Sequence, residues 1–156
     1  MKQIYKSFAV LLCLAALVSG CAGQPAKLPE AKVLVQALAE KAGGGMELAE
    51  VPEKVMLKLL MVEAETLVDS ALVMDTSRAT TTQFAVLTAK DEAQVKGHEA
   101  RFKEYQAMVL EQYRDYVPGE VPRIEKALLR RQGAQTVFVI CDDPGLAEQV
   151  LKDYWK

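Results

Sequence analysis

The chain has 156 residues, of which 51% are hydrophobic, 26% charged and 6% aromatic, and its formal net charge is −2. This length allows one domain, and the hydrophobic share is too high for a disordered chain. Without a basic surplus to displace phosphate counterions, nucleic acid is not an expected partner. Three cysteines cannot form a disulfide framework.

The first twenty residues have the pattern of an export signal. Lys2 and Lys6 precede an apolar run from Phe8 through Val18, and small residues follow the run. The run is shorter than the roughly 20 apolar residues that a membrane-spanning helix needs. Residues 1–20 are therefore expected to be a removable signal peptide.

The end of this signal, Val18-Ser19-Gly20-Cys21, resembles the bacterial lipobox. The resemblance implies that Cys21 becomes the mature N-terminus and carries a diacylglyceryl group through a thioether. Two or more acyl chains hold a protein stably at a membrane, because each buried methylene adds ~0.8 kcal/mol. The alternative is an ordinary cleaved signal in which Cys21 is an incidental residue.

Cleavage before Cys21 leaves 136 residues with a net charge of −4, because two lysines depart with the signal. Residues 21–28 are interpreted as a lipidated tether and residues 29–156 as a single domain. Ala22, rather than Asp, follows Cys21, so nothing indicates retention in an inner membrane. The expected location is the outer face of the cytoplasmic membrane, or the outer membrane in a host that has one.

Two helices are expected at the start of the domain. Pro29 opens the first, and Gly43-Gly44-Gly45 ends it, because glycine tolerates the left-handed conformation at a helix end. Pro52 suits the first position of a shorter second helix. The apolar stripes are Ala31, Leu34, Val35, Leu38 and Ala42 in the first and Val55, Met56, Leu59 and Leu60 in the second.

A strand–strand–helix unit is expected next. Residues 67–76 and 81–89 are rich in Val, Thr and Leu, as strands are. Asp91 can cap the following helix, with Gln94 in a capping-box arrangement, and the helix is expected to run to about Tyr113. Its inward stripe is Val95, His98, Phe102, Tyr105, Val109 and Gln112.

The same unit recurs after residues 118–122, a segment whose two prolines predict a loop that cannot be helical. Residues 124–131 and 135–141 are expected to be strands, and Asp143 caps the last helix with Pro144 in its first turn. The duplication predicts an α+β fold: two N-terminal helices, then a four-stranded, mainly antiparallel sheet with two helices on one face.

Two segments resemble a known family. Residues 82–91 (TQFAVLTAKD) are similar to its second strand and helix start. Residues 116–127 (YVPGEVPRIEKA) are similar to its return loop and third strand, which follow the pattern Y-x-P-x-E-V-P-x-I-E-x-A. Behind a lipobox, this resembles the domain-of-unknown-function 4358 family of small bacterial lipoproteins. The family implies fold and export, and brings no catalytic residues.

Two residues are candidates for reactive groups. His98 is the only histidine; no second histidine offers a metal pair, so it is interpreted as a packing residue. Cys141 lies just before a helix N-terminus, where the dipole favours thiolate. Because Cys141 shares a strand face with Val137 and Val139, packing as a small apolar group is preferred. No catalytic residue, metal or cofactor is expected.

Two charged groups have similarly plain interpretations. An adjacent pair, Asp142 and Asp143, offers too few oxygens for calcium; Asp143 is expected to cap a helix and Asp142 to be solvated. The basic set of Lys126, Arg130 and Arg131 could contact anionic lipid headgroups or cell-wall polymers. Charge that protects an exposed edge strand from aggregation is the preferred interpretation.

The inner strands are apolar on both faces. In a sheet that is covered on one side only, apolar and polar residues alternate along each strand. Val137 and Val139 lie opposite Phe138 and Ile140, for example. Either the N-terminal helices cover the second face, which we favour, or it binds a partner or a second copy.

The leading hypothesis is a non-enzymatic, lipid-anchored interaction or accessory module, bound to the membrane through Cys21 and to an envelope protein. The alternative is a small-ligand binder that assists a transporter, which predicts a roomy pocket with convergent polar groups. A thiol enzyme using Cys141 ranks third.

Overall fold

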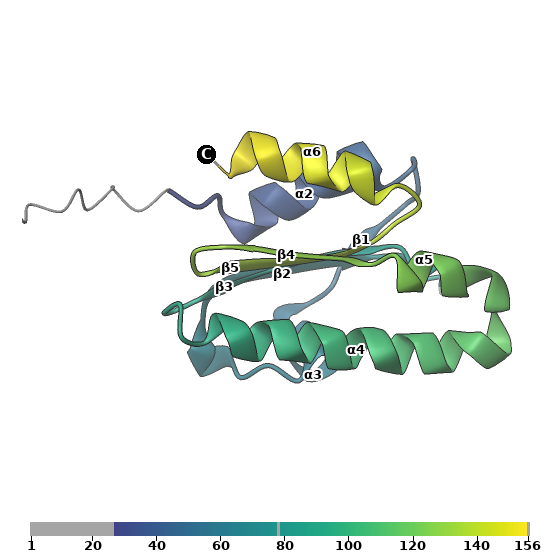
Figure 1. Cartoon of the computed structure of the whole chain (residues 1–156), viewed down its shortest axis with the longest axis horizontal. Helices are drawn as coiled ribbons and strands as arrows, with labels where there is room; N and C mark the ends of the chain where they lie inside the picture. Colours follow the sequence, from purple (N-terminus) through teal and green to yellow (C-terminus); the bar gives the residue numbers. More distant parts are fainter. Residues whose placement is uncertain (1–26, 78, 156) are drawn as a thin grey trace, which may run out of the picture.

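A five-stranded antiparallel sheet lies between two layers of helices (Figure 1) in the computed structural model, which describes residues 27–77 and 79–155. The strand order is β1-β2-β3-β5-β4. The strands are β1 (Ala49–Glu50), β2 (Leu67–Met74), β3 (Gln83–Ala89), β4 (Leu128–Gln132) and β5 (Gln135–Ile140). The predicted α+β class is confirmed.

The prediction of four strands was wrong by one. The additional strand, β1, has two exposed residues and pairs only with Val73 and Met74 at the end of β2. An element of two residues cannot show the alternation by which strands are recognised in a sequence. It also separates the two N-terminal helices, which we expected in direct succession.

The helices divide between the two faces of the sheet. One face is covered by α2 (Ala31–Ala42) and α6 (Pro144–Tyr154), and the other by α3 (Glu53–Leu60), α4 (Val95–Tyr116) and α5 (Val121–Glu125) (Figure 1). The prediction that the helices of the two repeated units share one face was wrong. Helix α4 belongs to the crossover from β3 to β4, so the opposite apolar face remains for α6 to cover.

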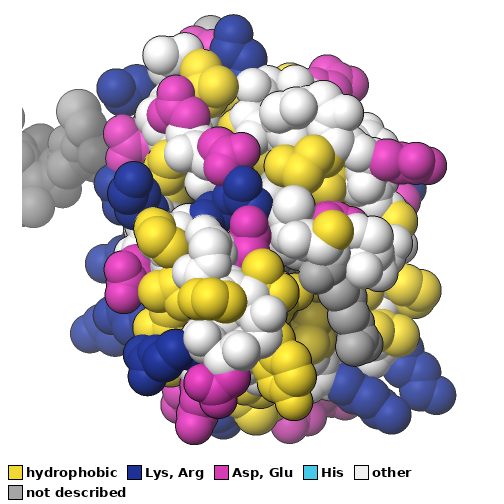
Figure 2. Space-filling model, turned by 90° about the vertical axis from the view of Figure 1, so that its right-hand side faces the viewer, with side chains coloured by type: hydrophobic (Ala, Val, Ile, Leu, Met, Phe, Trp, Pro, Cys, Tyr) yellow, Lys and Arg dark blue, Asp and Glu magenta, His cyan; other side chains and the backbone are white. Residues whose placement is uncertain are grey.

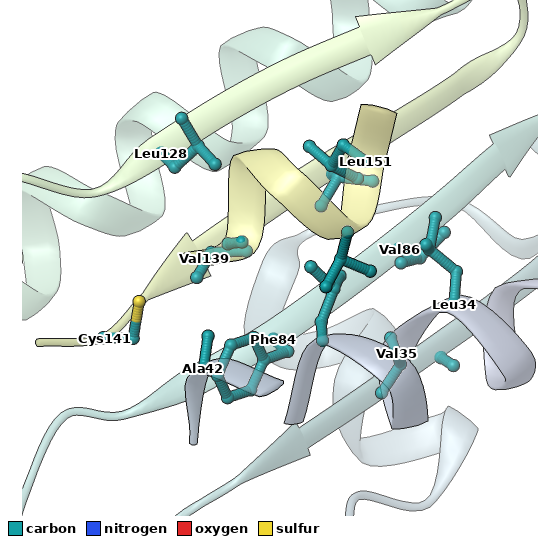
Figure 3. Close-up of a cluster of buried hydrophobic side chains, with 14 of the residues drawn as sticks. Leu34, Val35, Ala42, Phe84, Val86, Leu128, Val139, Cys141 and Leu151 are labelled. Carbon is teal, nitrogen blue, oxygen red and sulfur yellow. The ribbon is translucent and has the colours of Figure 1, made fainter. Parts of the chain in front are cut away.

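The favoured intramolecular cover of the second face is therefore confirmed, although the two N-terminal helices take opposite sides. Helix α2 packs beside α6 over Phe84, Val86 and Val139 (Figure 3). Helix α3 instead joins α4 over Leu72 and Leu87. Each face thus has its own hydrophobic core, with the strands shared between them.

Helix α2 begins and ends as its sequence indicates. The five residues of its predicted stripe are all buried. Its first N–H, that of Ala31, donates to Asp69 Oδ2 of β2 over 2.6 Å, which replaces a local cap. Gly44 and Gly45 have φ of +64° and +74°, so glycine provides the expected left-handed exit.

The return segment is helical, which corrects the predicted loop. A 3₁₀ turn at Pro118–Glu120 leads directly into α5, and β4 starts at Leu128 instead of residue 124. Both prolines lie at the first or second position of their element. Backbone N–H groups there have no intrahelical partner, so proline loses nothing.

The starts of α4 and α6 differ. Asp143 caps α6 as predicted and accepts a hydrogen bond from the Gly145 N–H over 2.9 Å. Asp91 accepts from the N–H groups of Ala93 and Gln94, but α4 begins only at Val95, so Asp91 caps the preceding turn. The predicted capping box was wrong. The predicted inward stripe of α4 is buried except for Gln112, which is exposed.

Candidate functional site

A cleft of about 700 Å³ opens beside the C-terminal half of α4. Leu59 of α3 and the adjoining ends of β2 and β3 also line it. It lies at the end of the molecule that faces the viewer in Figure 2, where hydrophobic side chains gather in the lower half. The volume is within the range typical of small-ligand pockets.

The walls of the cleft are mainly apolar and aromatic. Helix α4 contributes most of the lining, including the polar Gln112, and α3 and β2 contribute one residue each to the apolar part. The apolar and aromatic lining residues are Leu59, Met74, Tyr105, Met108, Val109, Tyr113, Tyr116 and Val117. Methionine side chains adapt to ligands of different shapes, because they are unbranched and polarisable.

The floor carries one buried hydrogen-bonded pair. The Tyr105 hydroxyl donates to Gln83 Oε1 over 2.9 Å, and both side chains are 2% exposed. Burial raises the pKa of Tyr105, and the Gln83 hydrogen bond only partly opposes this, so the phenol stays protonated. The pair therefore presents the amide nitrogen of Gln83 to the cleft.

One side of the rim is built around Asp75. Its carboxylate accepts hydrogen bonds from the N–H and hydroxyl of Ser77, at 2.8 and 2.5 Å, and from the same groups of Thr80, at 3.0 and 2.9 Å. The Ser77 bonds, with those of Thr80, lower the pKa of Asp75 to about 2, although desolvation acts in the other direction. Asp75 thus fixes the loop between β2 and β3.

The other side of the rim is tied to the return segment. Both the N–H and the hydroxyl of Thr81 donate to Glu120 Oε2, at 2.8 and 2.9 Å. Arg123 joins Glu120 to Asp142, with N–O distances of 2.6 Å to each. Burial alone would lower the Arg123 pKa, but the hydrogen bond and charge of Asp142, with the charge of Glu120, raise it.

This network accounts for two residues of the segment that carries the family resemblance. Glu120 anchors the start of β3 through Thr81, and Ile124 is fully buried while its carbonyl accepts from Gln106 Nε2 over 2.8 Å. The prediction that Asp142 is simply solvated was wrong, because Asp142 pairs with Arg123.

Cys141 lies outside the cleft, on the opposite face of the sheet. It is 1% exposed and packs with Ala42, Phe84 and Val139 (Figure 3). Burial raises the pKa of the thiol to about 11, although a backbone hydrogen bond at Asp143 acts in the other direction. The interpretation as an apolar packing residue is confirmed, and the thiol is protonated at neutral pH.

His98 is also buried away from the cleft. Its Nε2 lies 3.0 Å from Thr66 Oγ1, whose own hydrogen goes to the Glu63 carbonyl over 2.6 Å. The threonine oxygen is therefore the acceptor and Nε2 carries the proton. Burial lowers the pKa of His98, which keeps the ring neutral. The interpretation as a packing histidine is confirmed.

The basic set does not form one surface. Arg130 pairs with Glu148 of α6, whereas Arg131 lies 3.9 Å from Glu99 of α4, so the two arginines serve opposite faces of β4. β4 is an outer strand of the sheet, as the edge-protection interpretation requires. Among the described residues, no group of three or more His, Cys, Asp or Glu side chains could hold a metal ion.

The predicted signal peptide and Cys21 lie outside the described residues, as does most of the tether. Within ranges 27–77 and 79–155, no helix has the length and apolar character that crossing a bilayer requires.

Sequence reasoning missed the cleft, although it placed Tyr105 on the inward face of its helix. The available signals were weak: Gln83 is a polar residue on a strand face otherwise made of Ala85 and Leu87. Asp75 precedes Ser77 by two residues, a spacing typical of a side-chain-bonded turn. Neither signal indicates that the side chains share a cavity.

Comparison with known proteins identifies the family. Residues 45–141 match a family described as Domain of unknown function (DUF4358). This range runs from just before β1 to the end of β5, and includes the cleft and the return segment. No curated protein and no solved structure matches the chain. The match covers more than half of the chain, which therefore belongs to the DUF4358 family.

Proposed function

We propose that this protein is a lipid-anchored binding module on the outer side of the cytoplasmic membrane, and that its cleft captures a ligand without transforming it. The anchor rests on the lipobox-like sequence that ends at Cys21. The binding role rests on one observation, the cleft of about 700 Å³ with polar groups converging on an apolar cavity.

The position of the cleft relative to the tether supports this role. The chain enters the domain beside the start of β5, where the Pro29 carbonyl accepts from Gln135 Nε2 over 2.9 Å. Gln83, on the cleft floor, pairs with Ile140 at the other end of β5. Five residues of strand separate the two points, or about 17 Å. A domain held at Cys21 would thus present the cleft away from the membrane.

The placement of the reactive side chains favours binding over catalysis. Cys141 is buried on the α2 and α6 face with a pKa of about 11, and His98 is buried and held by Thr66. Neither lines the cleft. A general base or nucleophile must come within hydrogen-bonding reach of the substrate, and these two groups do not reach this cavity.

The anchor is tested by fractionation of the full chain expressed in a bacterium that processes lipoproteins. We expect the wild-type protein to enter the membrane fraction and the detergent phase, and the Cys21→Ala variant to lose both properties. Cys13→Ala is the matched control, because Cys13 lies within the signal and should leave the behaviour unchanged. Equal partitioning of Cys21→Ala and wild type would refute the anchor.

A further inference from the structure

We infer that the cleft is a site for an uncharged, mainly apolar molecule that carries a carbonyl or hydroxyl oxygen, and that Gln83 Nε2 is the donor to this oxygen. The inference rests on the proposed binding function and specifies the chemistry of that site. Three features of the cleft carry it: the apolar walls, an amide donor that is open to the cleft and has no partner among the described residues, and carboxylates that are already occupied.

The walls define the body of the ligand. Leu59 and Met74 line the cavity together with Met108, Val109 and Tyr105. Burial of apolar ligand surface against such side chains favours binding. Ring systems suit the aromatic part of the wall, because offset and edge-on contacts between rings add further stabilisation.

The floor defines one polar group of the ligand. Gln83 is 2% exposed, and its Oε1 is occupied by the Tyr105 hydroxyl. Within the described part of the chain, its Nε2 donates to no protein atom, and the side chain borders the cleft. This nitrogen is not among the fully buried side-chain atoms that lack a partner, so it is open to the cleft. A carbonyl or hydroxyl oxygen on a bound molecule would accept its hydrogen bond.

The charged rim residues that the structure describes favour an uncharged ligand. The Asp75 carboxylate already receives four hydrogen bonds from Ser77 and Thr80, and the Glu120 carboxylate is paired with Arg123. The hydroxyls of Thr80 and Thr81 donate to these same carboxylates. A cation would therefore compete with bonds already made, and an anion would approach the ionised Asp75.

The test uses two uncharged fluorescent naphthalenes and the mature chain from residue 21, expressed without the signal and therefore without lipid. Prodan carries a ketone oxygen, whereas N-phenyl-1-naphthylamine has the apolar body without any oxygen. Both emit more strongly in apolar surroundings. Since this chain needs no anchor, failure of the lipidation proposal would leave the experiment valid.

We expect prodan to bind, and Gln83→Leu to weaken its binding about 3- to 10-fold, the loss of one net hydrogen bond. Binding of N-phenyl-1-naphthylamine should change little in this variant. Met108→Trp, which fills the cavity, should abolish binding of both probes. Ala107→Trp is its matched control, because Ala107 is exposed on the same helix and does not line the cleft.

Circular dichroism confirms that each variant is folded. No binding of prodan up to its solubility limit would overturn the inference, as would binding that survives Met108→Trp. Equal weakening of both probes by Gln83→Leu would also overturn it, because the effect would then not depend on the ligand oxygen. Tighter binding of an anionic analogue, 1-anilinonaphthalene-8-sulfonate, than of its uncharged parent would contradict the charge assignment.

Discussion

At the scale of single residues, several partly buried polar side chains hold distant parts of the chain in place. Glu120 joins the return segment to β3, Asp69 of β2 accepts a hydrogen bond from the first N–H of α2, and Thr66 Oγ1 accepts one from His98 Nε2. Such long-range partners leave no trace in local sequence, so the sequence alone predicts a solvated Asp142 and places Glu120 in a loop.

The buried His98 predicts a pH dependence of stability. Its pKa in the folded chain lies below the usual 6.5, so the unfolded chain takes up the proton at higher pH. The free energy of unfolding should therefore fall as the pH is lowered from about 6.5 toward the folded pKa, by at most about 1.4 kcal/mol per pH unit. Well above pH 6.5 this contribution is constant.

Urea denaturation at about pH 7.5 and about pH 5.5 measures this effect, because most carboxylates titrate below that range. We expect His98→Gln to be less sensitive to pH than the wild type, since His98 is the only histidine. If the two proteins lost the same stability between these pH values, His98 would not be the group responsible.

At the scale of elements, the periodic segments could be predicted from sequence and the irregular ones could not. The strands β2, β3 and β5 and the stripes of α2 and α4 follow from apolar periodicity, which burial on one or both sides imposes. Helix α5 was missed because two prolines suggest a loop unless their position within the first turn is known.

The face on which each helix packs also lies beyond local sequence. A strand apolar on both sides indicates two covering layers but does not assign a helix to either one. Phe138 and Phe84 are equally buried on opposite faces of neighbouring strands. The cleft depends on this assignment, since it forms only where α3 and α4 lie on the same side.

Because Phe138 packs against α4, truncation of its side chain should lower the free energy of unfolding substantially. Its ring stacks on Phe102 with centroids 5.1 Å apart and meets Tyr105 edge-on at 6.0 Å. Phe138→Ala should lower the free energy of unfolding by about 3–5 kcal/mol, measured by chemical denaturation. Val55→Ala, at a 53% exposed position, should stay within about 0.5 kcal/mol. Similar losses for the two variants would contradict this packing.

At the scale of the whole molecule, Gln135 joins the two ends of the folded chain. Its Nε2 donates to the Pro29 carbonyl at 2.9 Å and to Thr88 Oγ1 at 3.0 Å, while its Oε1 accepts from the Trp155 indole at 2.8 Å. The residues that enter the domain and those that end it are thereby held at the same end of the sheet, opposite the cleft.

Replacement of Gln135 by Leu should release both ends and leave the cleft intact. Trp155 is the only tryptophan, so a shift of its emission to longer wavelength reports the C-terminal end. Faster amide hydrogen exchange in residues 29–34 would report release of the N-terminal end. Gln135→Glu keeps an acceptor for the indole but loses the amide donors, and should loosen only the N-terminal end. Unchanged tryptophan emission in Gln135→Leu would show that Gln135 does not hold the C-terminal end.

The account depends most on the claim that Cys21 is the acylated first residue of the mature protein, because that attachment places the tether end at a membrane and the cleft away from it. Mass spectrometry of the full chain expressed in a bacterium that processes lipoproteins tests this directly. We predict an N-terminal peptide that begins at Cys21 and carries a diacylglyceryl group. A mature chain that begins elsewhere, or an unmodified Cys21, would contradict the account.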